Sequence, residues 1–351
     1  MNAPLKAARL ARTVAALAKK RRKASGFCIG NTAKIDSQSL YFTPLRDTNL
    51  MVVAGVIVYS EAQAVQIARA VDGKVDRVLV DAEKKIPDEL SMRGDTANVE
   101  RAVRETLKRS ALWIYKGNDL SVEAVDCLLT QLTKSSVRGI GGKKAAILGA
   151  GNLGSKLALK LVERGASVAI TRRDVRKLRL ITEALNCIKP AYTTAKVQGL
   201  TDNRAAAANA DILIGTTNGK PVITAQMVRD LAPGAFIVDV GKGVFFPSAL
   251  REAERIGIPI HRLDITAAFE GLINELFAIE RIVERRQGRK FWRGESIVSG
   301  GLLGRRDEVV VDNIHRPRVV YGIADGRGDF LRTLSPKQLA RLRRIQEIVK
   351  A

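Results

Sequence analysis

From about residue 50 onwards, short apolar runs alternate with amphipathic stretches along the chain. Residues 51–59 are β-rich and apolar throughout, as expected of a strand that is covered on both faces. Residues 60–71 follow with apolar positions at helical spacing, and Ser60 is the expected helix cap. The pattern continues with a strand at 77–83, a helix at 96–110 and a strand at 111–117. This alternation predicts parallel strands joined by right-handed crossovers.

A second α/β unit is expected after the Gly-rich stretch 137–144, which we interpret as a hinge that follows a helix at 118–136. Its strands are predicted at 144–150, 167–173, 211–217 and 235–241, its helices at about 153–164, 175–186 and 225–230, and a further helix and short strand within 247–264. A long helix at about 267–286 follows. The tail from residue 288 mixes glycine with basic residues and ends in a helix.

The sequence therefore predicts an α/β protein with a doubly wound, Rossmann-type parallel sheet preceded by a smaller α/β domain. We divide it into a basic N-terminal arm (1–26), a small α/β substrate domain (27–136), an NAD(P)-binding Rossmann domain (137–287) and a basic C-terminal tail (288–351). The longest apolar stretch, residues 50–59, is about half of what a membrane span needs, so no span is expected.

A glycine-rich turn follows the first strand of the second unit. Gly149, Gly151 and Gly154 have the G-x-G-x-x-G spacing, with a strand before them and a helix after them. Glycine permits the tight turn, the approach of a pyrophosphate and close packing of helix on strand, while free N–H groups at the helix start hold phosphates. The alternative is a turn with a purely structural role. The predicted dinucleotide loop consists of Gly149, Ala150, Gly151, Asn152, Leu153 and Gly154.

The end of the next strand indicates which dinucleotide binds. NAD-specific sites usually place an acid there, whereas arginine accommodates the 2′-phosphate of NADP. This chain has Thr171, Arg172 and Arg173, while Asp174 is expected to cap the following helix. NADP is favoured over NAD, which stays possible. The alternative for the two arginines is ordinary solvated surface.

Two further loops lie at the carboxyl ends of predicted strands, where ligands of open parallel sheets bind. The first contains Thr216, Thr217, Asn218 and the sequence "GKP"; the second contains Val240 and Gly241 within "VDVG". With the phosphate loop, they resemble the nucleotide domain of methylenetetrahydrofolate dehydrogenases. The resemblance covers roughly residues 142–241 and implies that the first of these loops borders the nicotinamide.

The order of domains is also similar to that of a broader group, which includes methylene-tetrahydromethanopterin dehydrogenases, shikimate dehydrogenases and amino-acid dehydrogenase relatives. The tyrosine and lysine that the folate enzymes carry four residues apart on an early helix have no clear equivalent here. The resemblance therefore implies an NAD(P)-dependent dehydrogenase with a substrate cleft between two domains.

Candidate catalytic residues follow the last strand of the small domain. Lys116 could orient or protonate a carbonyl or imine, and Asp119 could accept a proton. Asn118 and Asp119 resemble a shortened form of the "N-x-D" of shikimate-type enzymes, although either residue could simply cap the next helix. Lys242, just after "VDVG", is a further candidate.

The net charge of +23 is unusual, and residues 1–26 contain no acidic residue. This segment is either a solvated basic helix, an arm for nucleic acid or another anionic surface, or an organelle transit peptide. A nucleic-acid partner is not favoured, because aromatic residues make up only 5% of the chain. We expect a cytoplasmic homo-oligomer acting on a small molecule, with an organellar location as the alternative.

The three cysteines are far apart, and buried thiols are expected for Cys127 and Cys187. The two histidines have no nearby His or Cys partner, so no metal site is expected. Two functions remain. One is an NADP-dependent oxidoreductase for a pterin-linked one-carbon unit, a shikimate-like hydroxy or keto acid, or an amino acid. The other is a non-catalytic, NADP-binding regulatory protein with a basic surface for an anionic partner.

Overall fold

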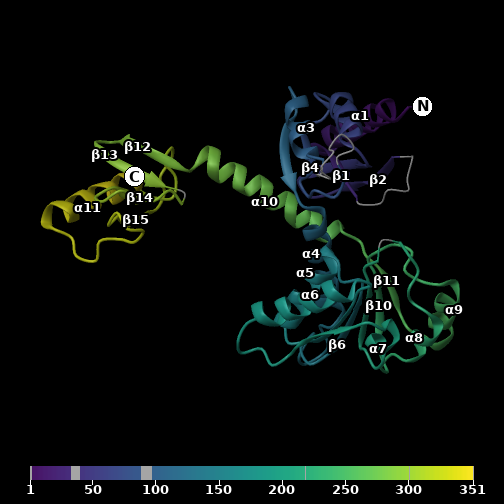
Figure 1. The fold of residues 1–351 in the computed structure, drawn as a ribbon. Helices are drawn as coiled ribbons and strands as arrows, with labels where there is room; N and C mark the ends of the chain where they lie inside the picture. The colour runs from purple at the N-terminus through teal and green to yellow at the C-terminus, as the bar shows by residue number, and fades with distance from the viewer. Residues whose placement is uncertain (1, 33–39, 88–96, 218, 300, 351) are drawn as a thin grey trace. The chain divides into compact units, whose positions relative to one another are not determined.

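The computed structural model describes residues 2–32, 40–87, 97–217, 219–299 and 301–350. The chain forms two compact units, residues 1–272 and 273–351, and the first contains two α/β sheets (Figure 1). Among the described residues, no helix combines the length and the apolar character needed to cross a membrane.

The N-terminal sheet has the strand order β2-β3-β1-β4-β5. The expected strands are confirmed as β3 (Met51–Val58), β4 (Arg77–Asp81) and β5 (Ala111–Tyr115). Two further strands were not predicted: β1 (Ala24–Asn31), which lies in the centre, and β2 (Tyr41–Asp47), which pairs antiparallel with β3 at the edge. β1 pairs in parallel with both β3 and β4. Its glycine-rich sequence "ASGFCIGN" has little strand propensity, so its pairing partners define it.

Helix α1 (Ala3–Arg21) covers one face of this sheet together with α2 (Glu61–Val71) and α3 (Val99–Thr106). Residue 96, where we expected the third of these helices to begin, lies outside the described residues. The segment expected as a basic arm is thus a packed helix. Ala7, Ala11, Val14 and Ala18 recur at helical spacing and are fully buried, and their small side chains let α1 pack closely on the sheet.

The second sheet has the order β11-β10-β9-β6-β7-β8 with all strands parallel. In chain order this reads 6-5-4-1-2-3, the doubly wound arrangement that binds dinucleotides where the order reverses. The predicted α/β fold class is confirmed. The strands are β6 (Lys144–Leu148), β7 (Ser167–Thr171), β8 (Val197–Leu200), β9 (Ile212–Gly215), β10 (Phe236–Asp239) and β11 (Ile260–Arg262).

Helices cover both faces of this sheet, and two apolar cores result. Helix α4 (Gly117–Leu132), which follows β5, contributes Val125 and Leu129 to the core beneath β6. The chain therefore passes directly from the first sheet to the second through β5 and α4. The other helices are α5 (Asn152–Glu163), α6 (Val175–Ile188), α7 (Asn203–Ala207), α8 (Ala225–Arg229) and α9 (Pro247–Ile256).

The long helix α10 (Thr266–Arg285) leads into the second unit. The tail holds a four-stranded sheet that the sequence pattern did not predict: β12 (Gly288–Trp292), β13 (Glu295–Ser299), β14 (Val309–Val311) and β15 (Val320–Ile323). Its strands are short and separated by basic loops, which obscures their alternation. The predicted terminal helix is present as α11 (Pro336–Lys350).

The prediction of buried thiols was wrong for two cysteines. Cys127 and Cys187 are exposed. Each lies on a helix whose buried residues, such as Leu129 in α4 and Leu185 in α6, occupy a different face. Apolar neighbours in sequence therefore did not imply an apolar environment in space.

Candidate functional site

The glycine turn between β6 and α5 has the geometry that a dinucleotide requires. Gly149 has a φ of +111°, which favours glycine. A Cβ at Gly154 would collide with the carbonyl oxygen of Gly149 and would lie 3.0 Å from Thr216 Oγ1. A Cβ at Gly151 would meet no atom within 4 Å. The turn is therefore tight where helix and strand meet and open where a phosphate would approach.

The start of α5 is available to an anion. Gly151 is its N-cap, no side chain caps this end, and its first turn contains no acidic residue. Its first N–H groups therefore need an external acceptor, and the helix dipole favours a negative one. A pyrophosphate satisfies both requirements, so the residues present fit a dinucleotide cofactor.

The loop after β9 is bonded to this turn. Thr216 Oγ1 donates to the carbonyl oxygens of Leu148 (3.0 Å) and Gly149 (2.8 Å), and Thr217 Oγ1 donates to the carbonyl oxygen of Lys220 (2.8 Å). Two of the predicted cofactor residues, Thr216 and Thr217, thus line one side of the phosphate loop. Asn218 lies outside the described residues.

The loop after β10 closes against the same region. The backbone N–H groups of Val240 and Gly241 each donate to the carbonyl oxygen of Gly215 at 3.0 Å. A Cβ at Gly241 would collide with the carbonyl oxygen of Thr217, so only glycine allows this approach. The three loops that we predicted from separate motifs therefore meet at the carboxyl ends of β6, β9 and β10.

The end of β7 carries the predicted ribose-binding residues. Thr171 is buried and its carbonyl oxygen accepts the N–H groups of Gly149 and Ala150. Arg172 donates from Nη1 to the carbonyl oxygen of Ala150 (2.6 Å), whereas its buried Nε has no hydrogen-bond partner in the described part of the chain. Arg173 is exposed. An arginine that is bonded to the phosphate loop and keeps an unused hydrogen-bond donor is suited to bind a 2′-phosphate.

Among the described residues, no acid side chain occupies this position beside Arg172. As predicted, Asp174 caps α6 and accepts the N–H of Lys177 (3.0 Å).

The candidate catalytic residues after β5 lie next to the start of α5. Asn118 donates from Nδ2 to Asn152 Oδ1 (3.1 Å), and Asp119 forms an ion pair with Lys156. Lys116 is the N-cap residue of α4, is largely exposed, and lies 3.5 Å from Asp119. The structure thus brings Asn118 and Asp119 to the cofactor domain, whereas Lys116 is largely exposed and contacts Asp119.

A group of polar residues that sequence reasoning missed lies beside them, at the carboxyl ends of β1 and β4. Lys85 Nζ contacts Asp81 Oδ2 (2.7 Å) and Glu83 Oε2 (2.8 Å), and Glu83 Oε1 lies 3.4 Å from Lys156 Nζ. Asn31 donates from Nδ2 to the carbonyl oxygen of Asp81 (2.9 Å). We call Asn31, Asp81, Glu83 and Lys85 the edge cluster. Our strand prediction ran to residue 83 and so included two of its members; the polar run "DAEKK" was the available signal.

The edge cluster is largely buried and has one unused acceptor. Asp81 and Asn31 are 2% and 6% exposed, and the buried Oδ1 of Asn31 has no hydrogen-bond partner among the residues that the structure describes. A buried acceptor without a donor is costly, and a hydroxyl of a bound ligand would supply one. The cluster therefore has the composition of a site for a small polar molecule.

The carboxylates of Glu83 and of the neighbouring Asp119 are held in the charged form. Burial opposes the charge of Glu83, but the hydrogen bonds from Lys85 and from the backbone of Asn118 outweigh burial and lower its pKa. Burial likewise opposes the charge of Asp119, and Lys156 lowers the pKa of that carboxyl. The pKa of Lys156 is raised, because its two carboxylate partners outweigh its burial. Asp119 is therefore a weaker proton acceptor than its position alone suggested.

Lys242 has a φ of +56°, and its backbone N–H donates to Asp239 Oδ1 (2.8 Å). Its ammonium lies 5.5 Å from the centre of the Tyr41 ring, which belongs to β2. The predicted candidate Lys242 thus contacts the N-terminal sheet. This contact places Lys242 at the boundary of the two domains, and it does not indicate a catalytic role for the lysine.

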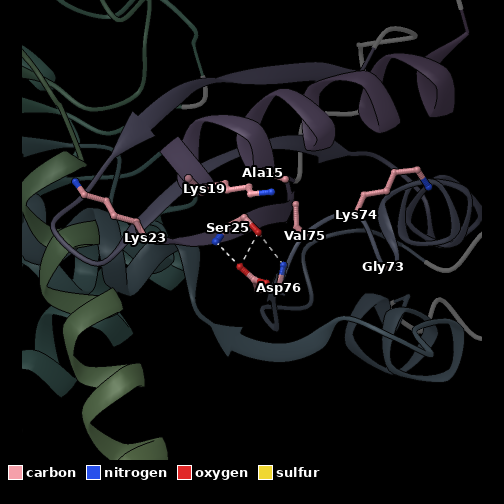
Figure 2. Close-up of a pocket in the computed structure, with 9 residues that line it drawn as sticks. Ala15, Lys19, Lys23, Ser25, Gly73, Lys74, Val75 and Asp76 are labelled. Atoms are coloured by element: carbon pink, nitrogen blue, oxygen red, sulfur yellow. Dashed lines mark hydrogen bonds between the residues drawn. The ribbon is translucent and has the colours of Figure 1, made fainter. Parts of the chain in front are cut away.

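A cavity of about 250 Å³ lies at the opposite, amino edge of the N-terminal sheet. It is lined in part by Lys19, Lys23 and Lys74, and at its centre Ser25 and Asp76 hydrogen-bond one another (Figure 2). Lys23 is already bonded to Asp47 and to the carbonyl oxygen of Thr48. Because ligands of parallel sheets bind at the carboxyl ends of strands, this cavity is not the candidate site.

Comparison with known proteins supports part of the predicted resemblance. Residues 131–243 match the model of the family described as Shikimate / quinate 5-dehydrogenase. The matched segment runs from the end of α4 past β10 and contains the phosphate loop. The Rossmann domain of this chain is dehydrogenase-like. The resemblance to methylenetetrahydrofolate dehydrogenases stays a prediction.

Glycerol-3-phosphate dehydrogenase [NAD(P)+] of Bacillus subtilis (strain 168) is 29% identical over 123 residues, which are 34% of this chain and 36% of that protein. The chain therefore spans about a third of the length of this curated relative. L-tryptophan dehydrogenase from Nostoc punctiforme is 14% identical, with a TM-score of 0.40 over 72% of this chain and 73% of that one. Hetero-hexameric glutamate dehydrogenase from Thermus thermophilus is 12% identical, with a TM-score of 0.42 over 74% and 69%. Similarity at this level does not identify an activity.

Proposed function

We propose that this protein is an NADP-dependent oxidoreductase that transfers a hydride between the cofactor and a small polar substrate held at the edge cluster. The observation that carries the proposal is the phosphate loop: an uncapped helix start, an open approach at Gly151, and glycine required at Gly149 and Gly154. The match of residues 131–243 to a dehydrogenase family supports the same conclusion.

NADP is the cofactor that we propose, with NAD as the alternative. Arg172 is fixed by its bond to Ala150 and retains an unpartnered Nε. A guanidinium in this position pairs with a 2′-phosphate, and no carboxylate there accepts a ribose hydroxyl, because Asp174 is engaged as a helix cap.

For the chemical step, the bound nicotinamide supplies the hydride acceptor or donor, and the protein must hold the substrate and move one proton. Lys85 is suited to the proton, because it is only 15% exposed and two carboxylates fix its ammonium. Asn31 Oδ1 is suited to accept a hydrogen bond from a hydroxyl group of the substrate. Asn118 and Asp119 then act as positioning residues, since their side chains bond to Asn152 and Lys156 on α5.

A hydroxy or keto acid of the shikimate or quinate kind is the substrate that we propose first, because its hydroxyl groups suit an uncharged acceptor such as Asn31 and the ammonium of Lys85. An amino acid and a pterin-linked one-carbon unit are the alternatives.

Fluorescence titration with NADPH and NADH tests the cofactor assignment, and we expect saturable binding with NADPH preferred. Absorbance of NADPH then reports turnover with shikimate, quinate, glutamate, tryptophan or methylenetetrahydrofolate. Lys85→Met should abolish most turnover while leaving NADPH binding intact. Lys84→Met is the matched control, because Lys84 is the exposed neighbour in sequence. Absence of saturable binding for either nucleotide would refute the proposal. NADPH binding without turnover on any of these compounds would favour a regulatory protein instead.

A further inference from the structure

The N-terminal sheet also has a face that α1, α2 and α3 do not cover. Successive residues of a strand point to opposite faces of a sheet. Phe27 and Ile29 of β1 belong to the helix-covered core, so Cys28 between them points the other way. Val53 of β3 also points away from the helices, because its two neighbours in the strand belong to that core. We call the side of the sheet that bears Cys28 and Val53 the second face.

Two polar side chains point onto the second face from opposite edges of the sheet. Arg46 of β2 pairs with Val53, and residues that pair across two strands point to the same face. Tyr115 of β5 follows Ile114, which packs against the helix-covered core, so Tyr115 points to the second face as well. Its hydroxyl lies 3.3 Å from the position that a Cβ of Gly30 would occupy. Tyr115 therefore reaches from the edge strand β5 to the central strand β1.

The charge of Arg46 acts on groups at the centre of this face. Burial raises the pKa of the Cys28 thiol to about 12, and the positive charge of Arg46 opposes this shift. Burial also raises the pKa of the Tyr115 hydroxyl well above its ordinary value, and Arg46 again opposes the shift. Because a charge acts only on groups near it, the guanidinium lies close to both side chains. Both groups stay protonated at neutral pH, so the Tyr115 hydroxyl is available as a hydrogen-bond donor.

The protein itself leaves these donors unused. Among the described residues, Arg46 forms no ion pair or hydrogen bond, and the Tyr115 hydroxyl forms no hydrogen bond. Asp264 is near enough for Arg46 to contribute to the lowering of its pKa, but its hydrogen bonds from Thr266 are the main cause. Asp264 Oδ1 accepts both the backbone N–H (2.9 Å) and the hydroxyl (2.6 Å) of Thr266 at the start of α10. The half-buried guanidinium of Arg46 can therefore still gain an anionic partner.

The second face also adjoins the residues that we propose for the reaction. Asp81 pairs with Tyr115 across β4 and β5, and Lys85 Nζ lies 2.7 Å from Asp81 Oδ2. The ammonium of Lys242, in the loop after β10, lies 5.5 Å from the centre of the Tyr41 ring on β2. Lys85 thus lies beside Tyr115 at the carboxyl end of the strands, and a loop of the cofactor domain contacts the edge strand that carries Arg46.

We propose that Arg46 and Tyr115 bind the carboxylate of the substrate, so that the enzyme acts on a small hydroxy or keto acid. The planar guanidinium of an arginine pairs bidentately with a carboxylate, and the Tyr115 hydroxyl supplies a further donor. A phosphate ester has nearly two charges and three acceptor oxygens, which one guanidinium and one hydroxyl leave partly unpaired. The inference rests on the proposed function, because Lys85 is the group that would act on the other end of the acid.

Isothermal titration calorimetry of the full chain with quinate tests the inference. NADPH is present throughout, because it cannot oxidise quinate and binding is then measured without turnover. The uncharged cyclic polyol myo-inositol is the comparison ligand, and we expect quinate to bind more tightly. Arg46→Gln should weaken quinate binding by roughly 10- to 150-fold, because it removes hydrogen bonds between two charged groups. Tyr115→Phe should weaken it by on the order of fivefold.

Matched variants separate a local effect from a general one. Arg104→Gln is the control for Arg46→Gln, since Arg104 is an exposed arginine of α3 on the helix-covered side. Tyr192→Phe is the control for Tyr115→Phe, since Tyr192 is 99% exposed. Arg46→Lys keeps the charge without the bidentate geometry and should give an intermediate affinity. Thermal unfolding and NADPH titration of each variant check that the fold and the cofactor site are intact.

Steady-state oxidation of quinate by NADP+ supplies a second measurement. Arg46→Gln should raise KM and change kcat little, because the carboxylate is bound equally in the ground state and the transition state. Quinate, shikimate and glutamate all binding no more tightly than myo-inositol would overturn the inference, as would tighter binding of glycerol 3-phosphate than of quinate. Equal weakening by Arg46→Gln and Arg104→Gln would overturn it as well.

The two proposals fail in different ways. Quinate binding that depends on Arg46, without any reduction of NADP+, supports the carboxylate site and contradicts the oxidoreductase function. Turnover of quinate with an unchanged KM in Arg46→Gln supports the oxidoreductase function and contradicts the carboxylate site.

Discussion

Gly151→Ala separates cofactor binding from stability at the phosphate loop. The backbone of Gly151 has a φ of −89°, which alanine adopts without strain, and an added Cβ meets no atom of the protein within 4 Å. The methyl group therefore projects into the space where we place the pyrophosphate. It leaves the protein intact and obstructs the ligand.

The expected magnitudes follow from this geometry. Alanine is a poorer N-cap than glycine, which destabilises the fold. Alanine also stabilises the fold by about 0.4–1 kcal/mol, because it lowers the conformational entropy of the unfolded chain, so the two effects oppose one another. The free energy of unfolding should thus change by less than about 1 kcal/mol. Displacing the phosphate from one backbone N–H removes a hydrogen bond to a charged group, which is worth about 1.5–3 kcal/mol. NADPH should then bind about 10- to 150-fold more weakly.

Fluorescence titration measures the Kd for NADPH, and urea unfolding measures the stability of the same samples. Gly154→Ala is the contrasting variant, because its Cβ would collide with the carbonyl oxygen of Gly149. It should lose about 1–3 kcal/mol of stability as well as affinity, since α5 must move away from β6. If Gly151→Ala binds NADPH as tightly as the unaltered protein, no pyrophosphate lies at this turn and the cofactor argument fails.

The remaining predictions concern charge and thiols. Arg172→Gln should weaken NADPH binding at least about tenfold and leave NADH binding unchanged, and equal weakening of both would exclude a 2′-phosphate contact. Glu83 has a pKa below its ordinary 4.5, so it stabilises the fold above that pH, and this contribution is lost as the pH falls through the lower pKa. Unfolding midpoints measured between neutral and acid pH should decline less steeply in Glu83→Gln, and an unchanged profile would contradict the assignment. Cys127 and Cys187 should react with a disulfide reagent in the native protein, because both are exposed. Cys28 is half-buried, and burial raises the pKa of its thiol to about 12, so it should react more slowly than the other two thiols in the native protein, and three equally fast thiols would contradict this prediction.

The sequence by itself determined most of the Rossmann unit, although it did not predict β8 and α7. Its central strands are largely apolar because helices cover both faces, so the runs at 144–150 and 211–217 could be read directly, whereas the edge strand β8 contains Gln198 and Gly199. The phosphate loop was also predictable, because three glycines at fixed spacing meet steric requirements within one strand, turn and helix. Both features depend on neighbours in sequence.

The tertiary structure decided the features that depend on distant partners. β1 is central only because β3 and β4 flank it, since its own residues have little strand propensity. The basic segment at the N-terminus became a packed helix because a sheet face was present to bury its alanines. Asp81, Glu83 and Lys85 follow one strand, whereas Asn118 and Lys156 come from later helices, and only the meeting of two sheet edges forms one polar site from them. The periodicity of apolar residues in the sequence indicates which residues can be buried, and the tertiary structure determines which partners they pack against.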